Sequence, residues 1–233
     1  FTLLGFDPLL MCSTLIGMLG TVRAAQGERM RGLFWLGVGI GLGVLSKGPV
    51  ILLHLLPATV LAPWWATLPR GTIARWYLGV LGALLLGAAI ALAWAVPAAY
   101  FGGEAYRNAI FWGQTAGRMS ESFAHREPWW HYLSVLPLML FPWFLWPALW
   151  RGVAGLRDSI NEPSVRFLLA WILPVFIGFS LISGKQMRYL LPLVPAFALF
   201  AAYALQRVKD KPARYDLLLP AAACFLLSGV WIY

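Results

Sequence analysis

The stretch LFWLGVGIGLGVLSKGPVILLHLLPATVLAPWW, residues 33–65, decides the fold of this chain. Its main polar interruptions are His54 and the tetrapeptide Ser46-Lys47-Gly48-Pro49. A single helix of this length would extend about 50 Å, whereas the hydrocarbon core of a membrane is about 30 Å thick. The chain must therefore reverse inside the stretch, and the strongest helix breaker near its middle is the pair Gly48-Pro49.

The reversal has a consequence for Lys47. It leaves two arms of about 13 and about 16 residues, both shorter than the roughly 20 residues of a full membrane crossing. We therefore expect Lys47 slightly below the far membrane surface, where burial of a cation costs free energy. We interpret Lys47 as a recessed cation that binds an anion. The alternative is a tight turn whose lysine extends to the lipid headgroups.

The composition of the whole chain is typical of a membrane protein. Of its 233 residues, 61% are hydrophobic and only 12% are charged. The apolar runs are too long for barrel strands and do not alternate, so they predict an all-α, polytopic membrane helix bundle. We count about eight transmembrane helices in a single transmembrane domain, residues 1–233, with these apolar segments: 8–22, 33–45, 50–65, 77–99, 131–150, 167–183, 190–205 and 217–233.

The cations predict the orientation of these spans. The net charge of +9 could indicate nucleic-acid binding, but the cations lie between apolar spans, so we predict no nucleic-acid partner. One set of connections carries twelve cations and should face the cytoplasm, and the alternate set carries six. The six on the outer side, a minority that could bind anionic lipid phosphates, are Lys47, Arg107, Arg118, Arg126, Lys185 and Arg188.

Two further features belong to the predicted outer side. Asp7-Pro8 opens the first span, and Asp7 is either a helix cap or a carboxylate at the mouth of an outward cavity. The long connection 100–130 has apolar residues at helical spacing, which predicts one amphipathic helix lying in the interface. A purely structural surface helix is the alternative. His54, alone on an apolar helix, is most simply a satisfied packing residue.

A basic element, Gly184-Lys185-Gln186-Met187-Arg188-Tyr189, connects two later spans. Lys185 and Arg188 are three residues apart and would share a face if the turn were helical. A lysine together with a forked arginine suits a phosphate group. The alternative is two cations that extend to the headgroups.

Taken in order, these motifs resemble the aminoarabinose-transferase-like (ArnT-like) branch of the protein O-mannosyltransferase superfamily. The resemblance covers nearly the whole chain. The motifs that carry it are FDPLL (6–10), LSKGPV (45–50), WGQTAGR (112–118), FAHR (123–126), PWW (128–130) and KQMRYLLP (185–192).

The resemblance implies a membrane glycosyltransferase of the GT-C type. Such an enzyme, in the bacterial inner membrane with its active site facing the periplasm, moves a sugar from a polyprenyl-phosphate donor to lipid A, another glycan or a protein. The donor phosphate would lie near Lys47, Lys185, Arg188 and Tyr189, with Arg118 or Arg126 assisting. Asp7 borders the same cavity and is the candidate general base, because the acceptor hydroxyl must lose a proton.

The chain departs from the family pattern at its start. In this family, the principal catalytic acid and the acids that would bind a divalent metal come from an earlier outward loop, and only six residues precede Asp7. We therefore predict no metal ligands here and expect the chain alone to be inactive. Rival functions are a secondary transporter, which also uses broken helices, a membrane scaffold, and a ligase that uses a polyprenyl-pyrophosphate oligosaccharide.

Overall fold

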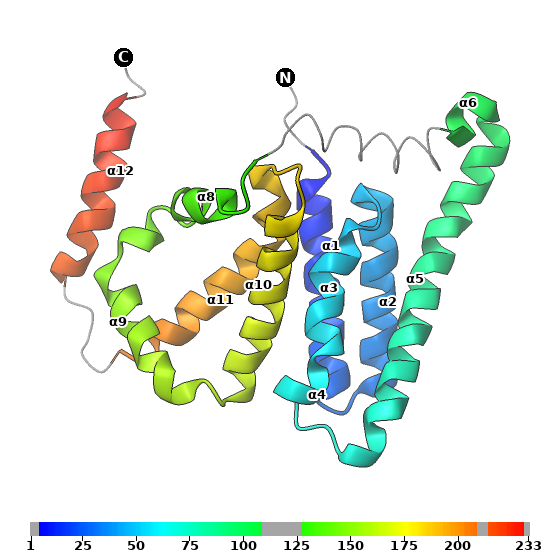
Figure 1. The fold of residues 1–233 in the computed structure, drawn as a ribbon, viewed down its shortest axis with the longest axis horizontal. Helices are drawn as coiled ribbons and strands as arrows, with labels where there is room; N and C mark the ends of the chain where they lie inside the picture. The colour runs from blue at the N-terminus through cyan, green and yellow to red at the C-terminus, as the bar shows by residue number, and fades with distance from the viewer. Residues whose placement is uncertain (1–4, 109–126, 209–213, 231–233) are drawn as a thin grey trace.

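A computed structural model describes residues 5–108, 127–208 and 214–230, and within these residues the fold is helical with no β-strand (Figure 1). The first half comprises α1 (Asp7–Ala25), α2 (Arg29–Lys47), α3 (Val50–Val60), α4 (Ala62–Trp65), the 3₁₀ turn η1 (Arg70–Thr72), α5 (Ile73–Phe101) and α6 (Gly103–Asn108). The second half comprises α8 (His131–Met139), η3 (Trp143–Leu145), α9 (Pro147–Gly155), η4 (Leu156–Ser159), α10 (Pro163–Leu181), η5 (Met187–Leu193), α11 (Val194–Leu205), η6 (Arg214–Leu217) and α12 (Leu218–Val230).

Helices α1, α2, α3 and α5 lie side by side in the first half of the chain (Figure 1). Helices α1 and α2 approach each other backbone to backbone through glycines. A Cβ atom built on Gly32 would lie 2.3 Å from the backbone nitrogen of Ala24. A Cβ atom built on Gly39 would lie 2.7 Å from the backbone nitrogen of Gly17. Small residues allow such close packing between membrane helices, where the hydrophobic effect does not drive association.

The predicted reversal at Gly48-Pro49 is present. Helix α2 ends at Lys47, and α3 begins at Val50 and runs back beside it. Gly48 has a φ of 76°, a left-handed backbone conformation that glycine adopts without the steric cost that a Cβ would bring. Lys47 therefore lies at the tip of the α2–α3 hairpin.

The prediction of one continuous span over 131–150 is wrong. The segment is divided into α8, η3 and α9, with a non-helical residue, Trp146, before α9. Pro142 and Pro147 are the physical reason, because two prolines this close together each remove a backbone N–H from the helical hydrogen-bond pattern. Helix α8 runs roughly horizontally beside the upper end of α10 in Figure 1, and α9 runs downward on its far side.

Four helical stretches of the described residues are long and apolar enough to cross a membrane, which supports a helical membrane bundle. They are Asp7–Ala25, Ile73–Phe101, Pro163–Leu181 and Met187–Leu205. The predicted count of eight is not reached: 131–150 is broken, Val50–Trp65 is too short, and the predicted spans 33–45 and 217–233 are not among the four either. The amphipathic helix predicted within 100–130 falls largely on residues 109–126, outside the described residues.

A polar network joins the start of α10 to the end of α11, at the end of the bundle opposite the tip of the α2–α3 hairpin (Figure 1). Arg207 donates from Nη2 to both carboxylate oxygens of Glu162, at 2.9 and 2.7 Å. The hydroxyl of Tyr203 donates to the same carboxylate, and Arg207 also bonds Ser159. These hydrogen bonds lower the pKa of Glu162 from 4.5 to about 2, and the hydrogen bond from Arg207 is the largest cause.

This pKa shift predicts a pH-dependent stability. Because the pKa of Glu162 is lower in the folded chain, its stabilising effect is full above about pH 4.5 and is lost as the pH falls toward 2. We expect Glu162→Gln to lower the melting temperature in detergent at pH 6 and to lower it less at pH 3.5. Asp158→Asn is the control, because Asp158 is exposed and has no hydrogen bond or ion pair within the part of the chain described here. An equal loss at both pH values would contradict the shift.

Candidate functional site

Asp7 and Lys47 form a salt bridge between the start of α1 and the end of α2. The two residues are 40 positions apart in the sequence, and their side chains are only 9% and 17% exposed. The alternative of a helix cap at Asp7 is wrong, because α1 begins at Asp7 itself and Phe6 holds the cap position. The anion that Lys47 was expected to bind is thus, in this structure, a carboxylate of the same chain.

Tyr189 adds an aromatic face to this pair. The Nζ atom of Lys47 lies 4.9 Å from the centroid of the Tyr189 ring, within the range of a cation–π interaction. The Tyr189 ring in turn packs against Phe179 of α10 with a centroid distance of 5.9 Å. Helix α1 also contacts η5, which carries Tyr189. Three separate elements therefore converge on one cation.

Lys185 lies just before η5 and is 5% exposed. Its Nζ donates to the backbone oxygen of Glu127 at 2.8 Å. The prediction that Lys185 and Arg188 share one helical face is wrong, because Gln186 is extended and η5 begins only at Met187. Lys185 therefore faces inward, whereas Arg188 is exposed and its Nε donates to Gln186 at 2.6 Å. Arg118 and Arg126 lie outside the described residues.

The segment 127–132 forms a wall that the sequence did not reveal as part of the site. The backbone N–H of Glu127 donates to Ser183, and the hydroxyl of the buried Tyr132 exchanges hydrogen bonds of 3.2 Å with the backbone of Gln186. The carboxylate of Glu127 lies 3.4 Å from Nδ1 of His131. The sequence offered the PWW motif (128–130) in this segment, but Glu127 precedes α8, so helical spacing could not predict its contact with His131.

His54 was predicted to be a packing residue whose polar atoms are hydrogen-bonded, and only the packing is observed. It is fully buried in α3 and its ring packs against Phe179 at 5.1 Å, so the packing part is confirmed. However, neither ring nitrogen has a hydrogen-bond partner within the described residues. The cost of an unpaired buried polar group is about 1–3 kcal/mol.

The arrangement is suited to holding an anion at one end of the bundle. Two lysines with little exposure, Lys47 and Lys185, are attached to a framework of hydrogen-bonded backbone and aromatic rings, so their positions are defined before an anion arrives. Cations with this little exposure stabilise developing negative charge more strongly than fully exposed cations do. Among residues 5–108, 127–208 and 214–230, no group of three or more His, Cys, Asp or Glu side chains could hold a metal ion.

Comparisons with known proteins identify related sequences. The model of the Alg9-like mannosyltransferase family matches residues 118–233. An undecaprenyl phosphate-alpha-4-amino-4-deoxy-L-arabinose arabinosyl transferase of Pseudomonas paraeruginosa is 36% identical over 194 residues, which cover 80% of this chain and 33% of that protein. A protein of the same name from Serratia proteamaculans is 28% identical over a region that covers 85% of this chain and 36% of that protein. Another, from Pseudomonas aeruginosa, is 35% identical over a region that covers 79% of this chain and 33% of that protein.

The chain thus spans about a third of the length of the curated relatives it matches. No solved structure matches it significantly.

Proposed function

Because the chain is a relative of the ArnT-like GT-C glycosyltransferases, we propose that the protein to which it contributes transfers a sugar from a polyprenyl-phosphate donor to a lipid, glycan or protein acceptor. The relatives are named for undecaprenyl phosphate-linked 4-amino-4-deoxy-L-arabinose, which makes this sugar the first donor to test. In this proposal the chain is a single helical membrane domain in the bacterial inner membrane. The end of the bundle that carries Asp7 and Lys47 faces the periplasm.

The observation that supports the proposal is the meeting of Asp7, Lys47 and Tyr189, with the buried Lys185 on the neighbouring segment before η5. In the proposed reaction, the acceptor hydroxyl oxygen forms a bond to the anomeric carbon while the bond from that carbon to the phosphate oxygen breaks. The bonding electron pair leaves with the lipid phosphate, whose negative charge increases. Lys47 and Lys185, with the exposed Arg188, would stabilise this charge in the transition state.

The proton of the acceptor hydroxyl needs a base. We propose Asp7, which is the carboxylate next to Lys47, although its salt bridge must loosen before it can accept a proton. Tyr189 would position Lys47 through its ring. Arg118 and Arg126 remain proposed phosphate contacts, and the principal acid and any metal ligands are proposed to lie in other parts of the protein.

Lys185 provides the most direct test of the phosphate contact. We expect Lys185→Met in the intact protein to reduce transfer from a radiolabelled undecaprenyl-phosphate sugar at least about tenfold, mainly through a higher KM for the donor, because a charge-assisted hydrogen bond is lost. Lys185→Arg should retain part of the activity. Arg75→Gln is the control, since Arg75 is an exposed cation in the first turn of α5, at the other end of the bundle from Lys47 (Figure 1). Unchanged donor dependence in Lys185→Met would refute the contact.

The same assay separates the rival functions. Chromatography of the released lipid should detect a polyprenyl monophosphate, whereas an oligosaccharide ligase would release a diphosphate. A secondary transporter would show substrate uptake into vesicles without any transfer product.

A further inference from the structure

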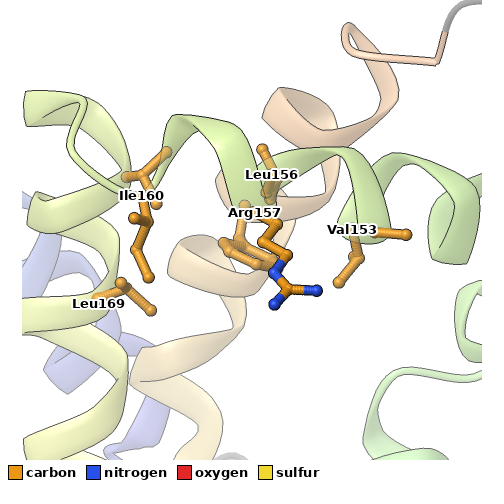
Figure 2. Close-up of a pocket in the computed structure, with 8 residues that line it drawn as sticks. Val153, Leu156, Arg157, Ile160 and Leu169 are labelled. Carbon is orange, nitrogen blue, oxygen red and sulfur yellow. The ribbon is translucent and has the colours of Figure 1, made fainter.

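A pocket lies at the end of the bundle opposite the Asp7–Lys47 pair. It is formed by α9, η4, α10 and α11 and has a volume of about 420 Å³ (Figure 2). Its walls are almost entirely apolar and come from Val153, Leu156, Ile160, Leu169 and Phe200, among others. The one charged side chain that lines it is Arg157 of η4. In Figure 2 the guanidinium group of Arg157 extends down between Val153 and Leu169.

Arg157 differs from the other arginines around this pocket. Arg151 forms two hydrogen bonds with Asp216, of 3.2 and 2.6 Å, and Arg207 is bonded to Glu162. Arg157 has no hydrogen bond, ion pair or ring contact within the part of the chain that the structure describes. It is exposed, so it does not carry the cost of an unpaired buried charge and remains available to an anion.

The location of the pocket restricts what the anion can be. The pocket is lined by α10 and α11, which belong to two of the stretches able to cross a membrane, and by Arg157 and Ile160 in the connection that precedes α10. This connection belongs to the cation-rich set, which the distribution of charges assigns to the cytoplasmic side. Basic pockets between membrane helices on that side are suited to anionic lipid headgroups. A free phosphate ion would leave the apolar walls without a partner.

We propose that this pocket binds an anionic phospholipid of the inner leaflet, with the phosphate on the Arg157 guanidinium and an acyl chain against Leu156, Ile160 and Phe200. The charge of the guanidinium complements that of the phosphate, and the apolar walls complement the chain. This binding is independent of the sugar-transfer proposal, because the pocket lies at the other end of the bundle (Figure 1).

The test measures thermal stabilisation of the intact protein in detergent as dioleoyl phosphatidylglycerol is added. Dioleoyl phosphatidylcholine serves as the neutral comparison, and glycerol 3-phosphate serves as a free phosphate without acyl chains. We expect phosphatidylglycerol to stabilise the wild type at lower concentration than phosphatidylcholine, and glycerol phosphate to have no effect. In Arg157→Gln, the half-stabilising concentration of phosphatidylglycerol should rise about tenfold, as expected for a lost charge-assisted contact. Arg75→Gln, which removes another exposed cation that does not line the pocket, should leave this concentration unchanged.

A second variant tests the acyl chain. Ile160→Trp places a large ring in the pocket without removing Arg157 and should also weaken stabilisation by phosphatidylglycerol. Equal effects of Arg157→Gln and Arg75→Gln, or equal stabilisation by the two lipids in the wild type, would overturn the proposal. Stabilisation by glycerol phosphate alone would identify a free-phosphate site instead.

Discussion

Replacing Lys47 by methionine is expected to reduce sugar transfer by the intact protein at least about 100-fold. The magnitude follows from the loss of a preorganised cation at the place where charge develops, which costs about 10²–10³ in rate in well-studied enzymes. The measurement is kcat with saturating donor, because the loss should concern the transition state more than donor binding.

A double substitution separates this catalytic role from a structural one. Lys47→Met leaves the carboxylate of Asp7, which is 9% exposed, without its partner, and breaking such a pair costs about 3–5 kcal/mol when the remaining charge is buried. Asp7→Asn together with Lys47→Met removes both charges and should restore much of the thermal stability. If the pair only holds α1 against α2, transfer will return together with stability. We expect stability to return and transfer to remain lost.

The second large effect concerns Gly32 in the contact between α1 and α2. A Cβ at this position would lie 2.3 Å from the backbone nitrogen of Ala24 and 2.5 Å from the backbone oxygen of Gly20. Backbone atoms cannot rotate away as a side chain can, so the two helices must separate. We expect Gly32→Ala to lower the free energy of unfolding by about 3 kcal/mol or more, at the upper end of overpacking effects. The measurement is thermal unfolding followed by loss of the monodisperse protein in detergent.

Gly82 offers a matched control for this substitution. It lies on the exposed side of α5, and a Cβ there would meet no atom within 4 Å. Gly82→Ala should therefore be neutral or stabilising, because alanine favours the helix by up to about 1 kcal/mol. Equal effects of the two alanines would show that the α1–α2 contact adapts easily. Because Asp7 and Lys47 lie at the far end of this helix pair, Gly32→Ala should also weaken their salt bridge.

Much of the architecture could be predicted from the sequence, because the membrane imposes strong constraints. The length of residues 33–65 demanded a reversal, and the only strong breaker near the middle marks its position. The same constraint brought Lys47 to the end of the bundle where Tyr189 lies. The length argument failed at 131–150, where the apolar character persists but Pro142 and Pro147 interrupt the helix.

The partners within the candidate site could not be predicted in the same way. Which carboxylate meets Lys47 depends on the packing of α1 against α2, and that packing rests on glycine contacts whose register no local pattern encodes. The inward position of Lys185 depends on a single extended residue, Gln186, which interrupts an otherwise helical spacing. The wall formed by residues 127–132 arises from backbone hydrogen bonds to Ser183 and Gln186, which side-chain identity does not specify.

The salt bridge between Asp7 and Lys47 also bears on how the proposed enzyme would complete its cycle. A lysine that faced only phosphate would hold the spent lipid carrier as firmly as the incoming one, and slow product release would limit turnover. With Asp7 beside it, the ammonium group has an alternative partner within the chain. Once Asp7 has released the proton it takes from the acceptor, its carboxylate would compete for Lys47 and help to displace the carrier, so that Asp7→Asn should bind added undecaprenyl phosphate more tightly than the wild type does.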